Sequence, residues 1–212
     1  MKKLIHALLA HPLVFDWQQR LCNNYGAIRE HFGEYLKVTD KDILDVGCST
    51  GNCAATVVSM TDNRYVGIDI EPQYVERAAR RYPAGRFLSM DARQLSFPAD
   101  HFDVILFVGA LHHMDDGLVK GCFEQLRRVL RPSGVVLCAE PVFTKGKLLS
   151  NLLLRHDRGG FIREEACYRR LFDGFAVVRQ AFFGFSVHRF CSFVLKKQAD
   201  ALLPVRGTAQ AA

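Results

Sequence analysis

The sequence predicts an α/β fold in which helices cover both faces of a mainly parallel β-sheet. Short apolar runs alternate along the chain with amphipathic stretches, which is the pattern of repeated β-α-β units. The 212 residues suit one compact domain, and 49% of them are hydrophobic, which is enough for a sizeable core. No internal repeat or low-complexity linker divides the chain. We therefore expect a single domain over residues 1–198.

The apolar runs up to residue 139 predict the parallel part of the sheet. Five of them have the length and composition of strands: 43–46, 65–69, 86–89, 104–108 and 135–139. Four amphipathic stretches predict helices: 24–37, 52–59, 72–81 and 116–130. Pro72 suits a first helical turn, where its missing N–H costs nothing. Pro132-Ser133-Gly134 is expected to form the turn before the fifth strand.

The rhythm of the sequence changes after Pro141. Residues 142–172 contain helical stretches and no clear strand, whereas 175–181 and 187–195 are two further strand-like runs. Gly184 lies near the expected turn between these runs, and a short turn joins only antiparallel neighbours. The sheet should therefore end in an antiparallel pair, followed by a frayed tail at 199–212.

Charge and cysteine content narrow the class of protein. The formal net charge is +6, but Lys and Arg are spread along the chain, so we expect a mildly basic surface. The seven cysteines are widely spaced without a CxxC pair, which argues against a disulfide framework or zinc ribbon and favours a reducing cytoplasm. Met1-Lys2-Lys3 and the following leucines resemble a signal peptide only superficially, because His6 interrupts a short apolar stretch. No apolar run approaches the ~18 residues of a membrane span.

The turn after the first strand predicts a site for a ligand with an ammonium group and no phosphate. Ligands of open α/β sheets bind outside the carboxyl ends of the strands. Gly47 and Gly51 allow the backbone to turn sharply there and to approach a ligand. The dinucleotide fingerprint G-x-G-x-x-G fails, because Ser49 and Asn52 replace its second and third glycines. Asp45 is a poor neighbour for a pyrophosphate and a good one for a cationic amine; an ordinary strand-to-helix turn is the alternative.

Two further carboxylates follow the second and third strands. Asp69 lies ~20 residues beyond the glycine turn, where a carboxylate can bind both hydroxyls of a ribose. Asp91 can accept a hydrogen bond from an exocyclic amine, with the N–H of Ala92 beside it. Helix capping is the alternative for both residues, because short polar side chains favour such positions.

Five segments together resemble class I S-adenosylmethionine-dependent methyltransferases. They are motif I at Ile43–Gly51, the ribose-binding strand at Val66–Ile70, the adenine-binding element at Asp91-Ala92, the fourth strand at Phe102–Met114 and the turn at Arg128–Gly134. One such motif is weak evidence, but five in order at the family's spacing are specific, and they cover residues 40–141. The resemblance implies a Rossmann-like, doubly wound sheet of seven strands with an antiparallel last strand. Ser49 and Ser133 replace family glycines; Ser49 should be tolerated if its backbone is not left-handed.

The resemblance also implies a cofactor, S-adenosyl-L-methionine, and its product, S-adenosyl-L-homocysteine. Ten residues are expected to contact it: Asp45, Gly47, Cys48, Ser49, Gly51, Asp69, Ile70, Asp91, Ala92 and Phe107. Tyr25 lies in the segment before motif I, where the family often places a lid residue. Its ring is expected either beside the sulfonium, a contact of ~1–2 kcal/mol when desolvated, or simply packed in the lid helix.

The segment after the fourth strand indicates the class of methyl acceptor. Enzymes that methylate amino groups of nucleic-acid bases carry a polar-Pro-Pro-aromatic motif there, and this chain has Phe107-Val108-Gly109-Ala110 instead. The resemblance is to enzymes that methylate oxygen or carbon of quinones, sugars, polyketides and lipid-like molecules by in-line displacement. We expect a small, hydrophobic substrate and no nucleic-acid partner. Nothing in the sequence separates oxygen from carbon transfer or fixes the oligomeric state.

His112 and His113 are the candidates for a general base, because imidazole titrates near neutral pH. Adjacent side chains point differently, so one is expected to face the site while the other packs, and His113 is favoured. With Asp115 and Asp116 they also form a possible metal-ligand set. We expect no metal, because the Leu-His-His pattern belongs to a metal-independent branch and the two aspartates suit a helix start.

The predicted domain therefore has a functional division. Its parts are N-terminal lid helices (1–39), a cofactor-binding core (40–141), a substrate cap (142–172) and the final strands (173–197). The apolar cap with its charged residues His156, Asp157, Arg158 and Arg163 suits a hydrophobic or anionic substrate, or else packs as an ordinary helix. The N-terminal segment, with Lys2 and Lys3 before leucines, suits either contact with the inner face of a membrane or a lid.

Two other functions use the same fold. A nucleotide-dependent oxidoreductase is disfavoured by the broken glycine fingerprint. A non-catalytic module that binds the cofactor without turnover is excluded by no single residue.

Overall fold

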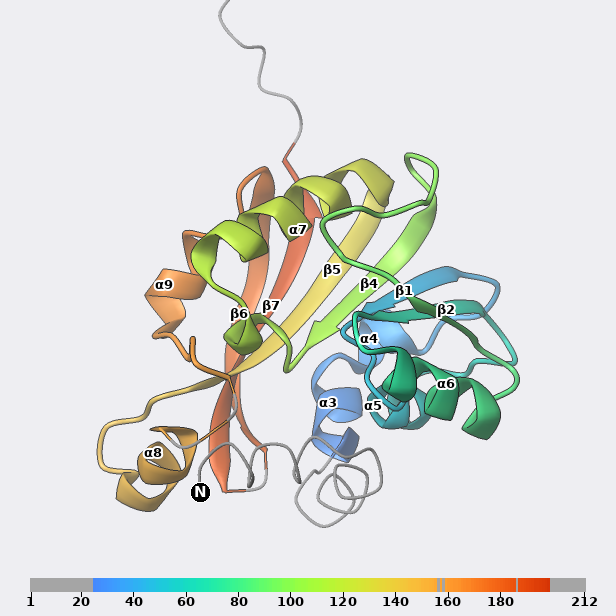
Figure 1. Ribbon diagram of the computed structural model, residues 1–212. Helices are drawn as coiled ribbons and strands as arrows, with labels where there is room; N and C mark the ends of the chain where they lie inside the picture. The colour runs from blue at the N-terminus through green and yellow to red at the C-terminus, as the bar shows by residue number, and fades with distance from the viewer. Residues whose placement is uncertain (1–24, 156, 158, 186, 199–212) are drawn as a thin grey trace, which may run out of the picture.

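Seven strands form one mixed sheet in the computed structural model, which describes residues 25–155, 157, 159–185 and 187–198 (Figure 1). Their order across the sheet is β3-β2-β1-β4-β5-β7-β6. The strands are β1 (Asp42–Val46), β2 (Arg64–Asp69), β3 (Arg86–Ser89), β4 (Phe102–Val108), β5 (Leu130–Val142), β6 (Phe175–Phe185) and β7 (His188–Lys197). The helices are α3 (Tyr25–His31), α4 (Gly33–Leu36), α5 (Asn52–Val57), α6 (Pro72–Arg81), η1 (Leu111–His113), α7 (Asp116–Val129), α8 (Leu148–Arg155) and α9 (Glu165–Arg169).

The directions of the strands confirm the predicted fold. Strands β1 to β5 run parallel, and β7 pairs antiparallel with both β5 and β6. The chain proceeds outward from β1 to β3 and then returns to place β4 on the other side of β1. Because this switch point separates the loops after β1 and β4, the carboxyl edge there is open to a ligand.

Two local expectations were wrong. Residues 132–134 do not form a turn, because β5 already begins at Leu130 and its pairing with β4 is irregular between Phe102 and Val104. A Cβ at Gly134 would lie 2.9 Å from the backbone oxygen of Asp103, so the close pairing requires glycine. The predicted helix 24–37 breaks at Phe32, whose side chain is fully buried and whose φ of −103° and ψ of 13° are not helical. Gly184 lies near the turn between β6 and β7, as predicted, and pairs with Arg189 within the ladder.

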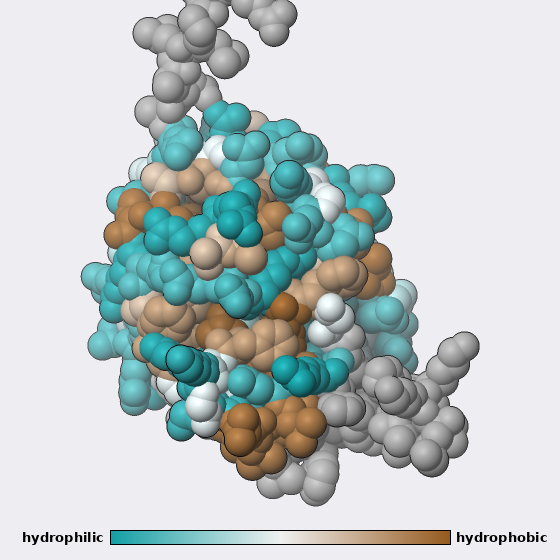
Figure 2. Space-filling model, turned by 90° about the vertical axis from the view of Figure 1, so that its left-hand side faces the viewer, coloured by the Kyte–Doolittle hydropathy of each residue, from teal (hydrophilic) through white to brown (hydrophobic). Residues whose placement is uncertain are grey.

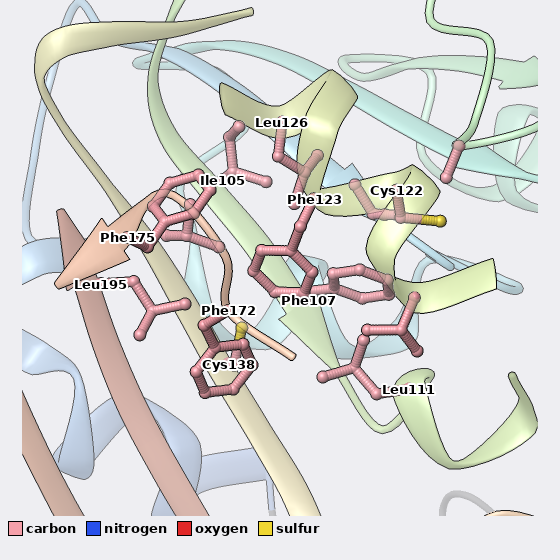
Figure 3. Packing of buried hydrophobic residues seen from close by; sticks show 14 of the residues in the cluster. Ile105, Phe107, Leu111, Cys122, Phe123, Leu126, Cys138, Phe172, Phe175 and Leu195 are labelled. Carbon is pink, nitrogen blue, oxygen red and sulfur yellow. The ribbon is translucent and has the colours of Figure 1, made fainter. Parts of the chain in front are cut away.

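The sheet is covered on both faces, as predicted. Buried side chains of α3, α5 and α6 pack on one face, and those of α7 and α9 pack on the other. Phe123 of α7 is central to the second core: its ring lies 6.1 Å from that of Phe107, 5.0 Å from Phe172 and 5.6 Å from Phe175 (Figure 3). The helices therefore fix β4 and β5, from whose carboxyl ends the site is built.

Some predictions fall on residues outside the described ranges. These are the lid and membrane-contact hypotheses for residues 1–24, Cys22, His156, Arg158 and the tail after 199. The six described cysteines are free thiols, as expected for reduced core residues. No helix within the described ranges combines the length and the apolar composition that crossing a bilayer requires.

Phe123→Ala should lower the free energy of unfolding by about 3–5 kcal/mol, because it removes a fully buried ring and leaves a cavity among three aromatic neighbours. Denaturant unfolding measures this loss. Val178→Ala is the matched control, because Val178 lies on β6 with half of its surface exposed, and the change should stay within about 0.5 kcal/mol. Equal losses in the two variants would contradict the assignment of the core.

Candidate functional site

The turn after β1 uses its backbone donors internally. The N–H groups of Gly47 and Cys48 both donate to the carbonyl oxygen of Ile68 at 2.9 Å, and that of Ser49 donates to Oδ2 of Asp69 at 2.9 Å. Loops that bind phosphate instead point successive N–H groups at the ligand. These three groups are consumed by β2, so the turn is built for a ligand without a pyrophosphate.

Ser49 departs from its expectation. Its φ is +49°, in the left-handed region, so the condition under which a serine was expected to be tolerated here is not met. Such a conformation costs a non-glycine residue about 1–2 kcal/mol, which the hydrogen bond to Asp69 helps to offset. Its hydroxyl Oγ is buried and has no hydrogen-bond partner within the described structure. A buried polar atom without a partner is costly, and a ligand that reaches this turn would relieve that cost.

Asp45 is buried at the end of β1, and it forms no ion pair within the described residues. Its carboxylate accepts a hydrogen bond from the hydroxyl of Tyr65 at 2.8 Å, and 4% of the residue is exposed. Burial raises its pKa to about 7, and the negative charge of Asp69 adds to this, although the Tyr65 hydroxyl opposes it. A ligand ammonium beside Asp45 would supply the missing opposite charge.

Asp69 holds the turn and the end of β2 together. One of its carboxylate oxygens accepts from the N–H of Ser49 and the other from the N–H of Glu71, at 2.9 and 3.0 Å. Although these hydrogen bonds lower the pKa of Asp69, burial outweighs them and raises it. Each oxygen keeps a second lone pair for a further donor, such as a hydroxyl. Ile70 follows with 65% of its surface exposed, an apolar side chain at the rim of the turn.

Asp91 is already engaged by a neighbour. The side chain of Arg93 donates to both of its oxygens, with a shortest contact of 2.6 Å, and the backbone N–H of Arg93 donates to Oδ1. These bonds lower the pKa of Asp91. Ala92 beside it is buried. Any ligand amine at Asp91 would therefore share this carboxylate with a guanidinium.

Three further predicted residues differ in how their side chains lie relative to the turn. The ring of Phe107 is fully buried against Phe123 in the α7 core (Figure 3). The thiol of Cys48 is buried next to Gly67 of β2, and burial together with the charges of Asp45 and Asp69 raises its pKa. Tyr25 begins α3 and packs, half-buried, against the core on the other face. The structure thus brings the thiol of Cys48, but not the ring of Phe107, close to Asp45 and Asp69.

A buried glutamate fixes the loop after β4. Glu140 of β5 is completely buried, and its Oε1 accepts from the N–H groups of Ala110 and Leu111, both at 2.9 Å. Its Oε2 accepts from the N–H of His112 and lies 2.7 Å from Nδ1 of the same residue. One carboxylate therefore satisfies three consecutive backbone donors and one imidazole.

His112 lies between two carboxylates. Its Nδ1 faces Glu140, and its Nε2 lies 3.5 Å from Oδ1 of Asp157. Burial disfavours a charge on the ring, but the contacts with Asp157 and Glu140 outweigh it and raise the pKa of His112 to about 9. The same pairing, against the effect of burial, lowers the pKa of Asp157 to about 2. These contacts favour the protonated ring at neutral pH, and they make His112 part of the scaffold that holds the loop.

Residues between Asp157 and Arg163 hold the same loop in place. The N–H of Phe161 donates to the carbonyl oxygen of His112 at 3.0 Å, and a Cβ at Gly159 would lie 2.1 Å from the His112 ring. The guanidinium of Arg163 donates to the carbonyl oxygens of Leu111 and Met114, at 3.0 and 2.6 Å. It also pairs with Asp116. Asp157 and Arg163 of the predicted cap therefore hold the loop that carries His112 and His113.

His113 is the exposed member of the histidine pair. Its ring centroid lies 4.2 Å from that of His112. The atoms of His112, His113 and Asp157 that could bind a metal ion lie within 4.8 Å of one another. Asp115 caps α7 through the N–H of Leu118 instead of joining this group. The expectation of no metal stays a prediction.

Sequence reasoning missed the partners of these residues. Glu140 carried a signal, since it is the one acidic residue in the apolar run from Val135 to Val142. Tyr65, Arg93 and Arg163 carried none, because their roles depend on contacts between separate elements.

The sequence comparison identifies a domain within this chain. Residues 43–134 match the family model described as "Methyltransferase domain". A 2-methyl-6-phytyl-1,4-hydroquinone methyltransferase of Synechocystis is 37% identical over 142 residues, which is 64% of this chain and 44% of that protein. A 27-O-demethylrifamycin SV methyltransferase of Amycolatopsis mediterranei is 38% identical over 105 residues, 47% of this chain and 38% of that protein. The matches thus span less than half the length of either relative.

Comparison of structures supports the same fold. A magnesium protoporphyrin IX methyltransferase of Synechocystis, solved with bound SAH, has a TM-score of 0.65. The similarity covers 88% of this chain and 86% of that one, at 14% sequence identity. The predicted Rossmann-like methyltransferase fold is confirmed by this agreement.

The His112 network should make the protein less stable in mild alkali. The folded-state pKa of about 9 exceeds the value of about 6.5 for an unfolded histidine, so the stabilisation is complete below pH 6.5 and is lost as the pH rises through 9. Denaturant unfolding should show a loss of about 1.4 kcal/mol for each pH unit between 7.5 and 9. In His112→Gln this slope should be absent, and an unchanged slope would remove the charged pair from the account.

Proposed function

Because the chain carries a methyltransferase domain over residues 43–134, we propose that it is an enzyme that transfers a methyl group from S-adenosylmethionine to a small molecule. The acceptor atom is an oxygen or a carbon of a hydrophobic or lipid-like metabolite. The two relatives support this class, because one is named for a phytyl hydroquinone and the other for an oxygen position of rifamycin. The free cysteines of the described residues suit a reducing compartment such as the cytoplasm.

The observation that carries the proposal is the chemistry of the turn after β1. It presents two carboxylates of raised pKa, the buried Asp45 and the partly buried Asp69, while its first N–H groups are occupied. Such an edge favours a ligand with an ammonium and hydroxyls over one with a pyrophosphate. This also disfavours the nucleotide-dependent oxidoreductase.

The residues present fit S-adenosylmethionine. Asp45 would hold its ammonium group and Asp69 its ribose hydroxyls, and the unpartnered Oγ of Ser49 supplies a further polar contact at the same turn. Ile70 and Asp91 would bound the adenine. When bound, the cofactor would supply a methyl group activated by a sulfonium. Cys48 and Phe107 would contribute backbone or packing only.

The chain's own task is then to orient the acceptor and remove its proton. Glu140, Asp157 and Arg163 hold the loop that carries the histidines, so His113 has a fixed support. An oxygen acceptor would donate its proton to the ring of His113, which is exposed beside the cationic ring of His112. A rigid loop of this kind favours an in-line approach of the acceptor.

The test is a binding and turnover experiment with the full chain. Calorimetry should detect S-adenosylhomocysteine binding and no binding of NADH. Transfer of a labelled methyl group should then be measured on a panel of hydroquinones, phenols and sterols. Binding without transfer to any acceptor would support the non-catalytic module, and binding of NADH alone would overturn the proposal.

Asp69→Ala should weaken S-adenosylhomocysteine binding by about 1.5–3 kcal/mol, the range for hydrogen bonds to a charged group. Calorimetry measures the change. Asp173→Ala is the control, because Asp173 is an exposed carboxylate before β6. A variant with unchanged affinity and an unchanged melting temperature would end the ribose assignment.

The affinity for S-adenosylhomocysteine should depend on pH through Asp45. The carboxylate must lose its proton to pair with the ammonium, and its pKa in the free protein is about 7. The dissociation constant should therefore rise about tenfold for each pH unit below 7 and level off above it. Asp45→Asn should bind weakly with a much flatter profile; a wild-type profile that is flat from pH 5.5 to 8 is the contrary result.

His113→Ala should reduce turnover on an oxygen acceptor by about 10²–10⁴-fold while leaving cofactor affinity within twofold, because proton removal is lost and the turn is intact. Steady-state kinetics and calorimetry separate these effects. His101→Ala is the matched control, because His101 stacks on Phe97 before β4. Activity equal to that of wild type would remove His113 as the base.

A further inference from the structure

The outward face of α8 is apolar, the reverse of an ordinary surface helix. Four leucines project from it into solvent: Leu148, Leu149, Leu152 and Leu153 are 82, 65, 53 and 45% exposed. They occupy positions i, i+1, i+4 and i+5, which share one side of a helix. Ser150, a polar residue, is buried on the opposite side together with Leu154. A contiguous exposed apolar patch of this kind marks an interaction site.

Specific contacts hold the helix in this orientation. The Ser150 hydroxyl lies 3.0 Å from Nδ1 of His188 in β7. At the start of the helix, the side chain of Asn151 accepts from the N–H of Thr144 and donates to its carbonyl oxygen, at 3.0 and 2.9 Å. Rotation of α8 to bury the leucines would break these bonds, so their exposure belongs to the fold.

Three cations flank the apolar face. Lys145 and Lys147 precede it and Arg155 ends it, and all three are exposed. Residues 142–156 contain no Asp or Glu. Within the part of the chain that the structure describes, none of these three cations forms an ion pair. The complementary surface must therefore combine apolar material with negative charge.

The hairpin of β6 and β7 places further apolar and cationic side chains at the same end of the molecule. Helix α8 lies at the lower left of Figure 1, next to the ends of β6 and β7, and Figure 2 shows a hydrophobic patch at this height on that side. Val187, between these strands, is 54% exposed. Arg189 places its guanidinium 4.1 Å from the ring centroid of the exposed Phe182. Leucines, an aromatic ring and cations are the composition of helices and loops that lie on membranes.

We propose that the leucine face of α8, with Lys145, Lys147 and Arg155, docks on the surface of an anionic lipid bilayer. The leucines enter the boundary between headgroups and acyl chains, and the cations contact the lipid phosphates. Helix α8 follows β5, which carries Glu140 at its carboxyl end, so docking brings the candidate site toward the lipid. The proposal goes beyond methyl transfer and does not depend on it.

The experiment is sedimentation of the full chain with vesicles, and it needs no acceptor or turnover. Wild-type protein should bind vesicles of phosphatidylcholine containing about 30% phosphatidylglycerol and should bind pure phosphatidylcholine at least about tenfold more weakly. Leu148→Gln/Leu149→Gln should reduce binding to the anionic vesicles at least about tenfold. Lys145→Gln/Lys147→Gln should reduce it about 30-fold at low salt, with a smaller effect at high salt. Val178→Gln and Lys196→Gln, at exposed positions on β6 and β7, should bind like wild type.

Each other outcome contradicts the proposal. Absence of wild-type binding to anionic vesicles overturns it, as does equal loss in the control variants. A wild-type dimer that the leucine variants dissociate, without a change in vesicle binding, assigns the face to a second copy. A large fall in melting temperature in the leucine variants, again with vesicle binding unchanged, assigns it to another segment of this chain.

Discussion

A carboxylate buried at the carboxyl edge of this sheet must find a partner for its charge, and the site is organised by how each one does so. Glu140 finds its partners inside the protein: three backbone N–H groups and the imidazole of His112. Among the described residues Asp45 is paired with the hydroxyl of Tyr65, and its pKa rises to about 7. The satisfied carboxylate builds the scaffold, and the unsatisfied one is left for a ligand.

The scaffold explains why the two adjacent histidines differ. Glu140 and Asp157 hold His112 as a buried cation, and Arg163 ties the same loop to the segment after α8. His113 is thereby left exposed on a support that is fixed from two sides. The elements that rigidify the loop come from β5 and from the segment at 157–163, so the loop, the final part of the parallel sheet and the predicted cap form one unit.

The sequence was sufficient for much of this description. The apolar periodicity located every strand, and the spacing of Asp45, Asp69 and Asp91 placed three carboxylates at one edge, because the ends of parallel strands are adjacent. The sequence did not reveal how strongly each carboxylate interacts with its neighbours. Whether Asp91 is free or bound by Arg93, and whether Ser49 is left-handed, depends on side chains and backbone angles that no pattern encodes. The irregular start of β5 was likewise missed, since Pro132–Gly134 is typical of a turn and only its pairing with β4 draws it into the strand.

The central claim is that Asp45 receives the ammonium group of the cofactor. It is tested most directly by the affinities of S-adenosylhomocysteine and of 5′-methylthioadenosine, which lacks the amino-acid portion, for the wild-type protein and for Asp45→Asn at pH 7.5. The account predicts that the substitution weakens S-adenosylhomocysteine binding by about 1.5–3 kcal/mol and leaves 5′-methylthioadenosine almost unaffected. If both ligands lose the same affinity, or neither loses any, Asp45 does not pair with the ammonium, and the reason given for the chemistry of this edge is wrong.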